Sequence, residues 1–556
     1  MIVMDDLNKN GRFHHRDTYK DIPQHPPTST NSVLSEASEK IRTSAWITLA
    51  ILGCTLLVTF YGETMLLPAI RDIIGDFHIS YSTSSWILTA YLISGAVATP
   101  IAGKLSDIYG RKKMVLIVFI IYIIGISAGG LSSNISLLLI ARVIQGIGIS
   151  MFPIAFGIIR DQLPKDKLAV GVGVFSSMFA AGSVVGLAVG GTIIKNLGWH
   201  ATFLSIVPVA IILWVVINRF IQDNKAELET SISLDKPTSG KYSSKQSKAT
   251  ANSASSIDLK GAIALATTIA SFLLALTYIG NSNNLDSSAQ ITVISLAVLS
   301  MVSLTLFVII ERKASSPLIE LSLMAHKVLL PANIVILIFG ITMFMVYQTI
   351  PILVRSPQPL GFGGDAVSTA MVQLPFMIVI LVFAPSSGFI VSKIGNLKPT
   401  VAGTIIMTIG FLSLLVFHST EFTVAINLAI VAAGISLIQV GAFNITMEYT
   451  PLKYSGVSLG MSVVLFLIGS SIGPAIAGIY MQTHQEIIKG IGAGAFPSPI
   501  SYNFIFLTAT TISVISITLV IILRRRIMQS QSTLKLEMEA SNMKQDGRRD
   551  EVDKND

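Results

Sequence analysis

Long apolar segments alternate with short polar ones along most of the chain. A helix needs about 20 apolar residues to cross a hydrocarbon core of about 30 Å, and fourteen segments meet this requirement. They are too continuous for membrane β-barrel strands, whose polarity alternates over about ten residues. Because lipid offers no partners for open backbone groups, such segments must be helices. The pattern predicts an all-α integral membrane protein with about 14 transmembrane helices, at 46–69, 82–103, 114–131, 135–158, 168–194, 201–221, 260–280, 289–310, 328–354, 367–391, 398–417, 422–446, 456–481 and 502–524.

Three polar stretches flank or interrupt this apolar body. The middle one is rich in Ser, Lys and Thr and cannot form a hydrophobic core, so we predict a disordered linker. The two ends of the chain have the same polar character. The predicted division is a disordered cytoplasmic head at 1–44, a first six-helix half at 45–221, a cytoplasmic linker at 222–258, two inserted transmembrane helices at 259–311, a second six-helix half at 312–524 and a disordered cytoplasmic tail at 525–556.

Two patterns of small residues each occur twice in the chain, and the two copies are separated by nearly the same number of residues in both cases. The segment PIAG at 100–103 is followed seven residues later by Gly110, and PSSG at 385–388 is followed in the same way by Gly395, an offset of 285 residues. Glycines at 173, 182 and 186 recur at 460, 469 and 473, an offset of 287. We interpret this as a duplication that gives two pseudo-repeated six-helix bundles with two inserted helices. Such parallel repeats are typical of transporters that bind a small-molecule substrate between their halves.

Composition and charge agree with a membrane protein and add an orientation. The 556 residues are 51% hydrophobic and 13% charged, which is about half the charged share of soluble proteins. Thirteen Lys and Arg residues lie in short loops on one side of the predicted spans, and four lie on the other side. The positive-inside rule then makes both termini cytoplasmic, and we predict a multi-pass protein of the plasma membrane. These loops account for the net charge of +8, so no nucleic-acid partner is expected.

The sequence disfavours several other classes of membrane protein. It has no GxxxxGK[ST] loop, which an ATP-driven pump needs, and a channel would lack the two-half repeat. A polytopic membrane enzyme needs clustered His, Asp or Glu, but the eight His are scattered, so this class is the less favoured alternative. The only cysteine, Cys54, lies in an apolar run, which predicts neither a disulfide nor a cysteine metal site. We expect a monomeric secondary transporter, not an enzyme, without catalytic residues, metal or cofactor.

Several motifs resemble those of the major facilitator superfamily. The loop GKLSDIYGRKK at 103–113 is similar to its signature loop between spans 2 and 3, and RVIQGIG at 142–148 resembles its RxxQG motif. The segment ETMLLPAI at 63–70, followed by Trp86 and Tyr91, resembles spans 1 and 2 of the fourteen-span drug:proton antiporters. The resemblance implies proton-coupled export of hydrophobic or amphipathic compounds, of multidrug type, by alternating access. The partners would be the small-molecule substrate, protons and the lipid bilayer.

Two departures from the family pattern bear on the direction of transport. The segment GSVVGLAVGG at 182–191 resembles the antiporter motif, but Leu187 stands where that motif has proline. Glu63 stands where the drug antiporters usually have aspartate. Proton-coupled uptake or exchange of a small metabolite therefore stays as an alternative to export.

Glu63, Arg142 and Gln145 are the candidates for proton coupling or substrate contact. A charge inside the membrane costs about 2.5–3.5 kcal/mol and should face a cavity or a partner, so Glu63 could carry a proton or oppose a cationic substrate. The alternative is a carboxylate near the outer interface that bonds to a neighbouring helix. Arg142, the only basic residue of its span, also needs a partner. The resemblance implies a coupling role for Arg142; the alternative is a structural tie through carbonyl groups and Gln145.

The basic loop has a second candidate role besides anchoring. The family resemblance implies a conformational latch in which Asp107 holds a helix end or an arginine in one conformation and releases it in the other. Gly103 and Gly110 would permit close helix approach and a tight turn, and Arg111 follows directly. The alternative is a simple positive-inside anchor.

Two further groups of residues complete the candidate site. In span 5, Gly182, Gly186 and Gly190 lie on one helix face, and Gly191 is next to the last of them. This spacing favours close helix packing over the alternative, a conformational hinge. Polar residues inside spans could line a mainly apolar substrate cavity or bond to neighbouring helices. Those chosen as cavity candidates are Tyr347, Gln348, Gln373 and Gln439.

Overall fold

The computed structural model describes most of the apolar body. The described residues are 43–163, 168–221, 259–281, 287–314, 317, 321–450, 455–488 and 495–552. Among them are 14 helical segments long and apolar enough to cross a membrane, which confirms the predicted number. The predicted head up to residue 42 and the predicted linker at 222–258 lie outside the described residues.

Six of the spanning segments form the first half. They pack around a buried cluster that includes Leu52, Phe119 and Phe203. The elements of this half are α1 (Thr43–Thr64), η1 (Leu67–Ala69), α2 (Ile70–Phe77), α3 (Tyr81–Ser84), α4 (Trp86–Tyr109), α5 (Arg111–Gly130), α6 (Ile135–Gly146), η2 (Ile147–Ser150), α7 (Met151–Gln162), α8 (Leu168–Leu197) and α9 (Trp199–Phe220).

The other eight segments comprise the two inserted helices and the second half. The second half packs around a cluster that includes Phe339, Phe411 and Phe506. The inserted helices are α12 (Leu259–Asn281) and α13 (Ser287–Lys313). The elements that follow are α14 (Leu321–Met324), α15 (Leu329–Arg355), α16 (Ala366–Ile394), α17 (Leu397–Val416), α18 (Glu421–Glu448), α19 (Ser455–Thr483), β1 (Gln485–Ile487), β2 (Ala495–Pro497) and α20 (Pro499–Val552).

The two halves repeat one packing scheme. The contacts of α1 with α8, of α5 with α6, and of α5 with α9 recur as those of α15 with α19, of α17 with α18, and of α17 with α20. Gly110 and Gly395, matched in the sequence repeat, follow the second spanning helix of their half, α4 and α16, and have positive φ angles of 96° and 82°. Glycine adopts this conformation without steric cost. The pseudo-repeat inferred from sequence is therefore present in the fold.

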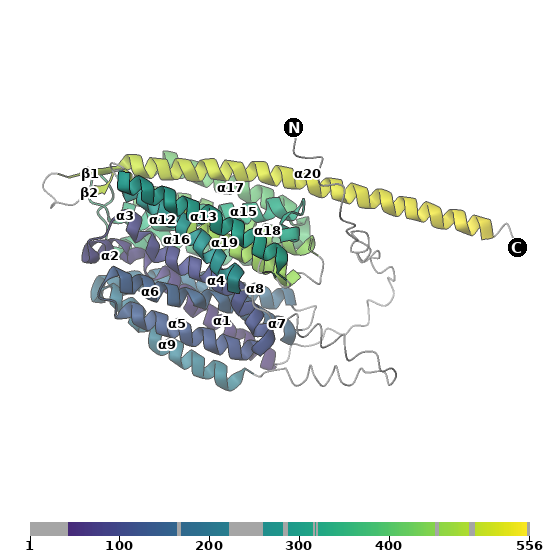
Figure 1. The fold of residues 1–556 in the computed structure, drawn as a ribbon, viewed down its shortest axis with the longest axis horizontal. Helices are drawn as coiled ribbons and strands as arrows, with labels where there is room; N and C mark the ends of the chain where they lie inside the picture. Colours follow the sequence, from purple (N-terminus) through teal and green to yellow (C-terminus); the bar gives the residue numbers. More distant parts are fainter. Residues whose placement is uncertain are drawn as a thin grey trace.

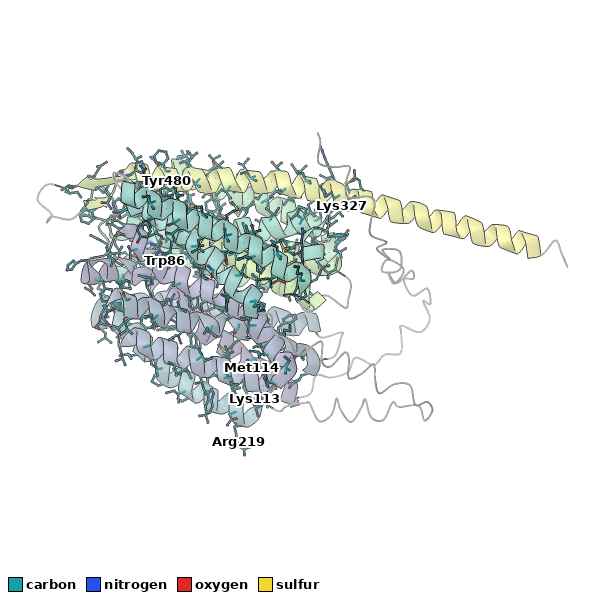
Figure 2. All side chains as sticks on the ribbon, in the orientation of Figure 1. Trp86, Lys113, Met114, Arg219, Lys327 and Tyr480 are labelled. Carbon is teal, nitrogen blue, oxygen red and sulfur yellow. The ribbon has the colours of Figure 1, made fainter. Side chains whose placement is uncertain are left out.

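The halves lie side by side, and α20 runs along the second half (Figure 1). They meet where α8 packs on α16 and α4 packs on α19. The inserted helix α12 contacts both α4 and α19, and Trp86 Nε1 donates to Thr277 Oγ1 of α12 at 2.8 Å. The end of the molecule that carries α2, α3 and the β1–β2 hairpin is named the hairpin end here. The opposite end, where α20 projects beyond the bundle, is the tail end; Figure 2 shows Tyr480 and Lys327 toward these two ends.

Two spans of the first half differ from the continuous helices predicted for them. In span 1, α1 stops at Thr64 and the chain resumes through η1, where Pro68 supplies no backbone N–H. In span 4, α6 gives way to η2 after Gly146, and Gly148 follows within η2. Glycine favours helix less than most other residues do. Both breaks leave the spans apolar, which is why hydropathy did not detect them.

The tail is another difference. We predicted disorder from residue 525, but α20 continues as helix to Val552. The segment LKLEMEA at 534–540 consists of strong helix formers. It extends a helix that has already formed in the membrane, so no new nucleation is needed.

Candidate functional site

Glu63, Arg142 and Gln145 lie next to the two helix breaks of the first half. Glu63 is the second-last residue of α1, and Gln145 is the second-last residue of α6. Carbonyl groups in the last turn of a helix lack amide donors from a following turn. The breaks thus expose backbone acceptors, including that of Gly62, to side chains of α6 inside the protein.

Arg142 binds these acceptors and ties three helices together. Its Nη1 donates to the Gly62 carbonyl of α1 at 3.1 Å and to Gln145 Oε1 at 2.9 Å. Its Nε donates to the Ile87 carbonyl of α4 at 2.9 Å. Gln145 Nε2 also donates to Gly62, at 3.3 Å. These bonds are the structural tie through carbonyl groups and Gln145 that the sequence analysis gave as one of two alternatives for Arg142. The Arg142 side chain that makes them is 0% exposed.

The guanidinium group of Arg142 also has a nitrogen that is not used in these hydrogen bonds. It lies 4.4 Å from the centre of the Tyr91 ring, a cation–π contact. Within the described part of the chain, Arg142 Nη2 and Tyr91 Oη have no hydrogen-bond partner. Tyr122 completes the cluster, since its hydroxyl donates to the Val58 carbonyl of α1 at 2.9 Å.

Glu63 is buried beside this cluster, with 3% exposure. It interacts electrostatically with Arg142 and Tyr91 in its own half and with Tyr347 in the second half. Among the described residues, however, its carboxylate has no ion pair with a nitrogen within 4.0 Å. The structure therefore brings Glu63 and Arg142 into one buried site without joining them.

The predicted latch residues flank the short turn between α4 and α5. Gly110 makes the turn with its positive φ, and Arg111 Nη1 donates to the Gly157 carbonyl of α7 at 2.9 Å. A Cβ atom at Gly103 would meet nothing within 4 Å. The side chain of Asp107 lies outside the described residues, so its role as a latch stays a prediction.

The span-5 glycines make close contacts, as their spacing suggested. A Cβ atom at Gly182 or Gly186 would collide with the backbone of α1, and one at Gly190 would collide with the backbone of Met65, just after α1. One at Gly191 would come within 2.8 Å of the Ala366 carbonyl of α16. Gly469 and Gly473, their counterparts, face α15 in the same way. These contacts are those of close packing, and a hinge function stays untested.

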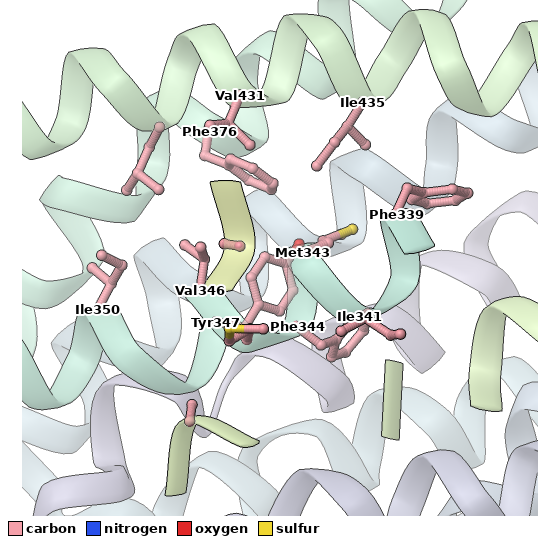
Figure 3. Packing of buried hydrophobic residues seen from close by; sticks show 14 of the residues in the cluster. Phe339, Ile341, Met343, Phe344, Val346, Tyr347, Ile350, Phe376, Val431 and Ile435 are labelled. Carbon is pink, nitrogen blue, oxygen red and sulfur yellow. The ribbon is translucent and has the colours of Figure 1, made fainter. Parts of the chain in front are cut away.

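Three of the four cavity candidates are buried in the second half. Tyr347 donates from its hydroxyl to Met377 Sδ at 3.4 Å, and Gln348 Nε2 donates to Ser84 Oγ of the first half at 3.1 Å. Gln373 is 3% exposed. Gln439, on α18, is only partly buried. Figure 3 shows Tyr347 and Phe376 within the surrounding apolar packing.

Sequence reasoning missed Tyr122 as a member of the cluster and the polar contacts between the halves at the hairpin end. A tyrosine in the middle of an apolar span was the available signal for Tyr122. No comparable signal exists for Asp72 with Arg355 or for Lys195 with Asp365. Each of these pairs joins residues of loops or helix ends that are far apart in sequence. In the described residues no group of three metal-ligating side chains is close enough to hold an ion.

The chain is similar to known transporters over most of its length. The sequence profile of the Major Facilitator Superfamily matches residues 52–474. The chain is 27% identical over 443 residues to the "Multidrug transporter protein MdtP" of Bacillus subtilis, covering 79% of this chain and 76% of that protein. It is 24% identical over 447 residues to the "Tetracenomycin C resistance and export protein" of Streptomyces glaucescens, covering 80% and 77%.

Two solved structures share the fold. The human organic anion transporter MFSD10 superposes with a TM-score of 0.56 at 12% identity, covering 86% of this chain and all of that one. The xylose transporter XylE of E. coli, in a partially occluded inward-open conformation, gives 0.54 at 11% identity, covering 85% and 97%. Identities this low support a common architecture and nothing about substrate.

Proposed function

Since the chain belongs to the major facilitator superfamily and is therefore a membrane transporter, we propose that it exports hydrophobic or amphipathic compounds in exchange for protons. The similar proteins from Bacillus subtilis and Streptomyces glaucescens, which are named for multidrug transport or for resistance and export, support this choice of direction and substrate class. We further propose that it acts as a monomer in the plasma membrane with both termini cytoplasmic. The distribution of Lys and Arg among the loops supports that orientation.

The observation that carries the proposal is the separation of Glu63 from Arg142 inside one buried site. Arg142 is fixed by carbonyl groups and Gln145. The carboxyl group of Glu63 thus remains available to a proton or to a cationic substrate. Burying an unpaired charge is costly, so occupation by one or the other is favoured. A group that binds either partner, but not both at once, couples their movement in opposite directions.

Contacts between the halves support alternating access. At the hairpin end Gln348 binds Ser84, and the backbone N–H of Tyr81 donates to Gln482 Oε1 at 3.0 Å. Toward the tail end, a Cβ atom at Gly103 or Gly388 would meet nothing within 4 Å. These glycines lie on α4 and α16, two helices at the boundary between the halves. Under the proposed orientation the hairpin end is the outer end, so these contacts close the outer side, as one of the two states of alternating access requires.

Transport of ethidium, a hydrophobic cation, by the purified protein in liposomes tests the proposal. With an acidic interior, the wild type should accumulate the dye, and dye addition should drive protons out. Glu63→Gln should abolish both effects, because the amide cannot bind or release the proton. Glu486→Gln, on the exposed β1 strand, is the matched control and should keep them.

The same measurement decides between export and the alternative, uptake or exchange of a metabolite. Leu187, in place of the motif's proline, is the feature that favours the alternative. Proton movement in the same direction as the substrate would favour uptake. No substrate-induced proton movement with any compound would contradict antiport.

A further inference from the structure

A narrow gap lies in the second half between α15, α16 and α18. Val346 and Tyr347 line it from α15, and Gln373, Phe376 and Met377 line it from α16. Figure 3 shows Val346, Tyr347 and Phe376 around this region, with α18 passing above them. In the conformation described, the gap leaves no room for a water molecule.

The amide oxygen of Gln373 points to a missing partner at this gap. It is buried, and within the described part of the chain it accepts no hydrogen bond. An unsatisfied buried polar atom costs about 1–3 kcal/mol, and native proteins contain few of them. Tyr347 is also weakly engaged, because its hydroxyl donates only to the sulfur of Met377. Two polar groups in an otherwise apolar wall are thus available to a ligand.

The surroundings suit an aromatic ligand. Tyr347 and Phe376 meet edge to face, with ring centres 5.6 Å apart and an angle of 77°. Phe344 extends the aromatic wall, 4.9 Å from the Tyr347 ring. Met377, which closes the gap, has a flexible and polarizable side chain that can move aside at little cost. Pro375, which stands between Gln373 and Phe376 in the chain, lacks the backbone N–H that would continue the hydrogen bonding of α16 and permits the helix to bend.

We propose that Gln373 is a specificity-determining residue that accepts a hydrogen bond from an N–H or O–H group of an aromatic transported compound. The ligand displaces Met377, its ring lies against Tyr347 and Phe376, and its donor satisfies Gln373. The preferred substrates are therefore aromatic compounds that carry an amino or hydroxyl group, ahead of equally apolar compounds without one. This inference rests on the transport function proposed above and names the class of substrate within it.

Two dyes with one skeleton provide the test. Proflavine has free amino groups on an acridinium ring, and acridine orange has the same groups fully N-methylated. The ring N–H is common to both dyes, so a difference between them reports the amino groups. Binding to the purified full-length protein in detergent is measured by fluorescence. The wild type should prefer proflavine, and Gln373→Met should weaken proflavine binding by about tenfold, the loss of one or two hydrogen bonds. Acridine orange binding should change by less than about twofold.

Thermal stability separates recognition from a structural role. Because Gln373→Met removes an unsatisfied buried acceptor, its Tm should equal or exceed that of the wild type. Gln290→Met, at an exposed position of the inserted helix α13, is the matched control and should leave the preference between the dyes unchanged.

Three outcomes would overturn the inference: failure of proflavine to bind the wild type, an equal loss for both dyes, or a lower Tm with an unchanged preference. Binding in detergent needs no proton gradient. The binding measurement therefore stays informative even if proton-coupled export fails. If export is intact but Gln373→Met leaves the preference between the two dyes unaltered, only the inference about Gln373 is contradicted.

Discussion

Arg355 holds Asp72 across the boundary between the halves with both terminal nitrogens of its guanidinium group. Nη1 lies 2.5 Å from Oδ2 and Nη2 lies 2.6 Å from Oδ1, while Nη1 also donates to the Pro68 carbonyl at 2.9 Å. Arg355 ends α15 and Asp72 lies in the first turn of α2. Each charge is therefore at the helix terminus whose dipole favours it. The pair ties the halves together at the hairpin end.

Asp72→Asn should weaken this closure. Hydrogen bonds between charged groups contribute about 1.5–3 kcal/mol, so states open at the hairpin end should gain about tenfold or more in population. Spin labels at Gly75 and Ser419, exposed sites in different halves, would report this as a longer distance by double electron–electron resonance. The exposed Cys54 must first be replaced by serine.

Exchanging the two charges is the control for that experiment. Asp72→Arg combined with Arg355→Asp can restore the ion pair, although each charge would then lie at the less favourable helix terminus. The distance distribution should return at least in part to that of the wild type. If Asp72→Asn alone left the distribution unchanged, the pair would not hold the hairpin end closed.

A second ion pair at the hairpin end predicts a dependence of stability on pH. Lys195 Nζ lies 2.8 Å from Asp365 Oδ2. The Lys195 ammonium and the Ser368 backbone N–H lower the pKa of Asp365 to about 2 from its ordinary value of 3.8. A lowered carboxyl pKa gives a stabilisation that is complete above the unfolded-state value and is lost as the pH falls from about 4 to about 2. Asp365 is 43% exposed, so solvent screens its charge, and this stabilisation should be only about 0–1 kcal/mol.

Asp365→Asn is the variant that isolates this charge. Asparagine caps a helix as well as aspartate does, so the bond from Ser368 N–H to the side chain, at 2.9 Å, can persist. The Tm of the variant should lie below that of the wild type at neutral pH, and the difference should vanish as the pH falls through that window. High salt should reduce it. A difference that persisted at pH 2 would assign the effect to the cap and not to the charge.

The helical spans could be predicted from sequence because each depends on a local property, namely about 20 apolar residues in a row. The duplication was also visible, since Gly110 and Gly395 must adopt a positive φ that other residues rarely take. The break after Thr64 was not visible. It depends on Pro68 acting within a segment that stays apolar, and hydropathy records polarity but not backbone hydrogen bonds.

The candidate site was also predicted only in part, because some of its members have a signal in the sequence and others do not. Glu63 and Arg142 stand out in sequence because charges are rare inside spans. The partners that fix Arg142 do not stand out, since the carbonyl groups of Gly62 and Ile87 carry no side-chain signal. Their availability follows from where helices end and meet. Only the three-dimensional packing of α1, α4 and α6 therefore distinguishes a tethered arginine from one paired with Glu63.

Gly186→Ala should separate α8 from α1. The added methyl group would collide with the side chain of Thr64 and come within 2.8 Å of the Tyr61 carbonyl, and Thr64 Oγ1 donates to the Ser183 carbonyl at 3.1 Å in the same contact. Overpacking of this kind costs about 1–3 kcal/mol, which should appear as a lower Tm in detergent. Gly460→Ala is the control, because a Cβ atom there would meet nothing within 4 Å. Equal stability of the two variants would contradict the packing role.

Arg142→Lys distinguishes the charge of Arg142 from its tether. Lysine keeps the charge but cannot direct separate donors to Ile87, Gly62 and Gln145 as the guanidinium group does. We expect a loss of at least about 2 kcal/mol in stability, because several charged hydrogen bonds are broken. The untethered ammonium group should also move to Glu63 and hold it ionised. Dye transport by this variant should then no longer respond to a proton gradient.

Gln145→Met provides the comparison for that result. It removes the bonds made by Gln145 but leaves those from Arg142 to Ile87 and Gly62, so the arginine stays tethered by two carbonyl groups. Stability should fall by about 1 kcal/mol, the contribution of an ordinary hydrogen bond, while proton-driven dye transport in liposomes persists. If Arg142→Lys retained coupled transport and Gln145→Met lost it, the positive charge would suffice at position 142. The coupling would then depend on Gln145, and the separation of Glu63 from Arg142 would have no part in it.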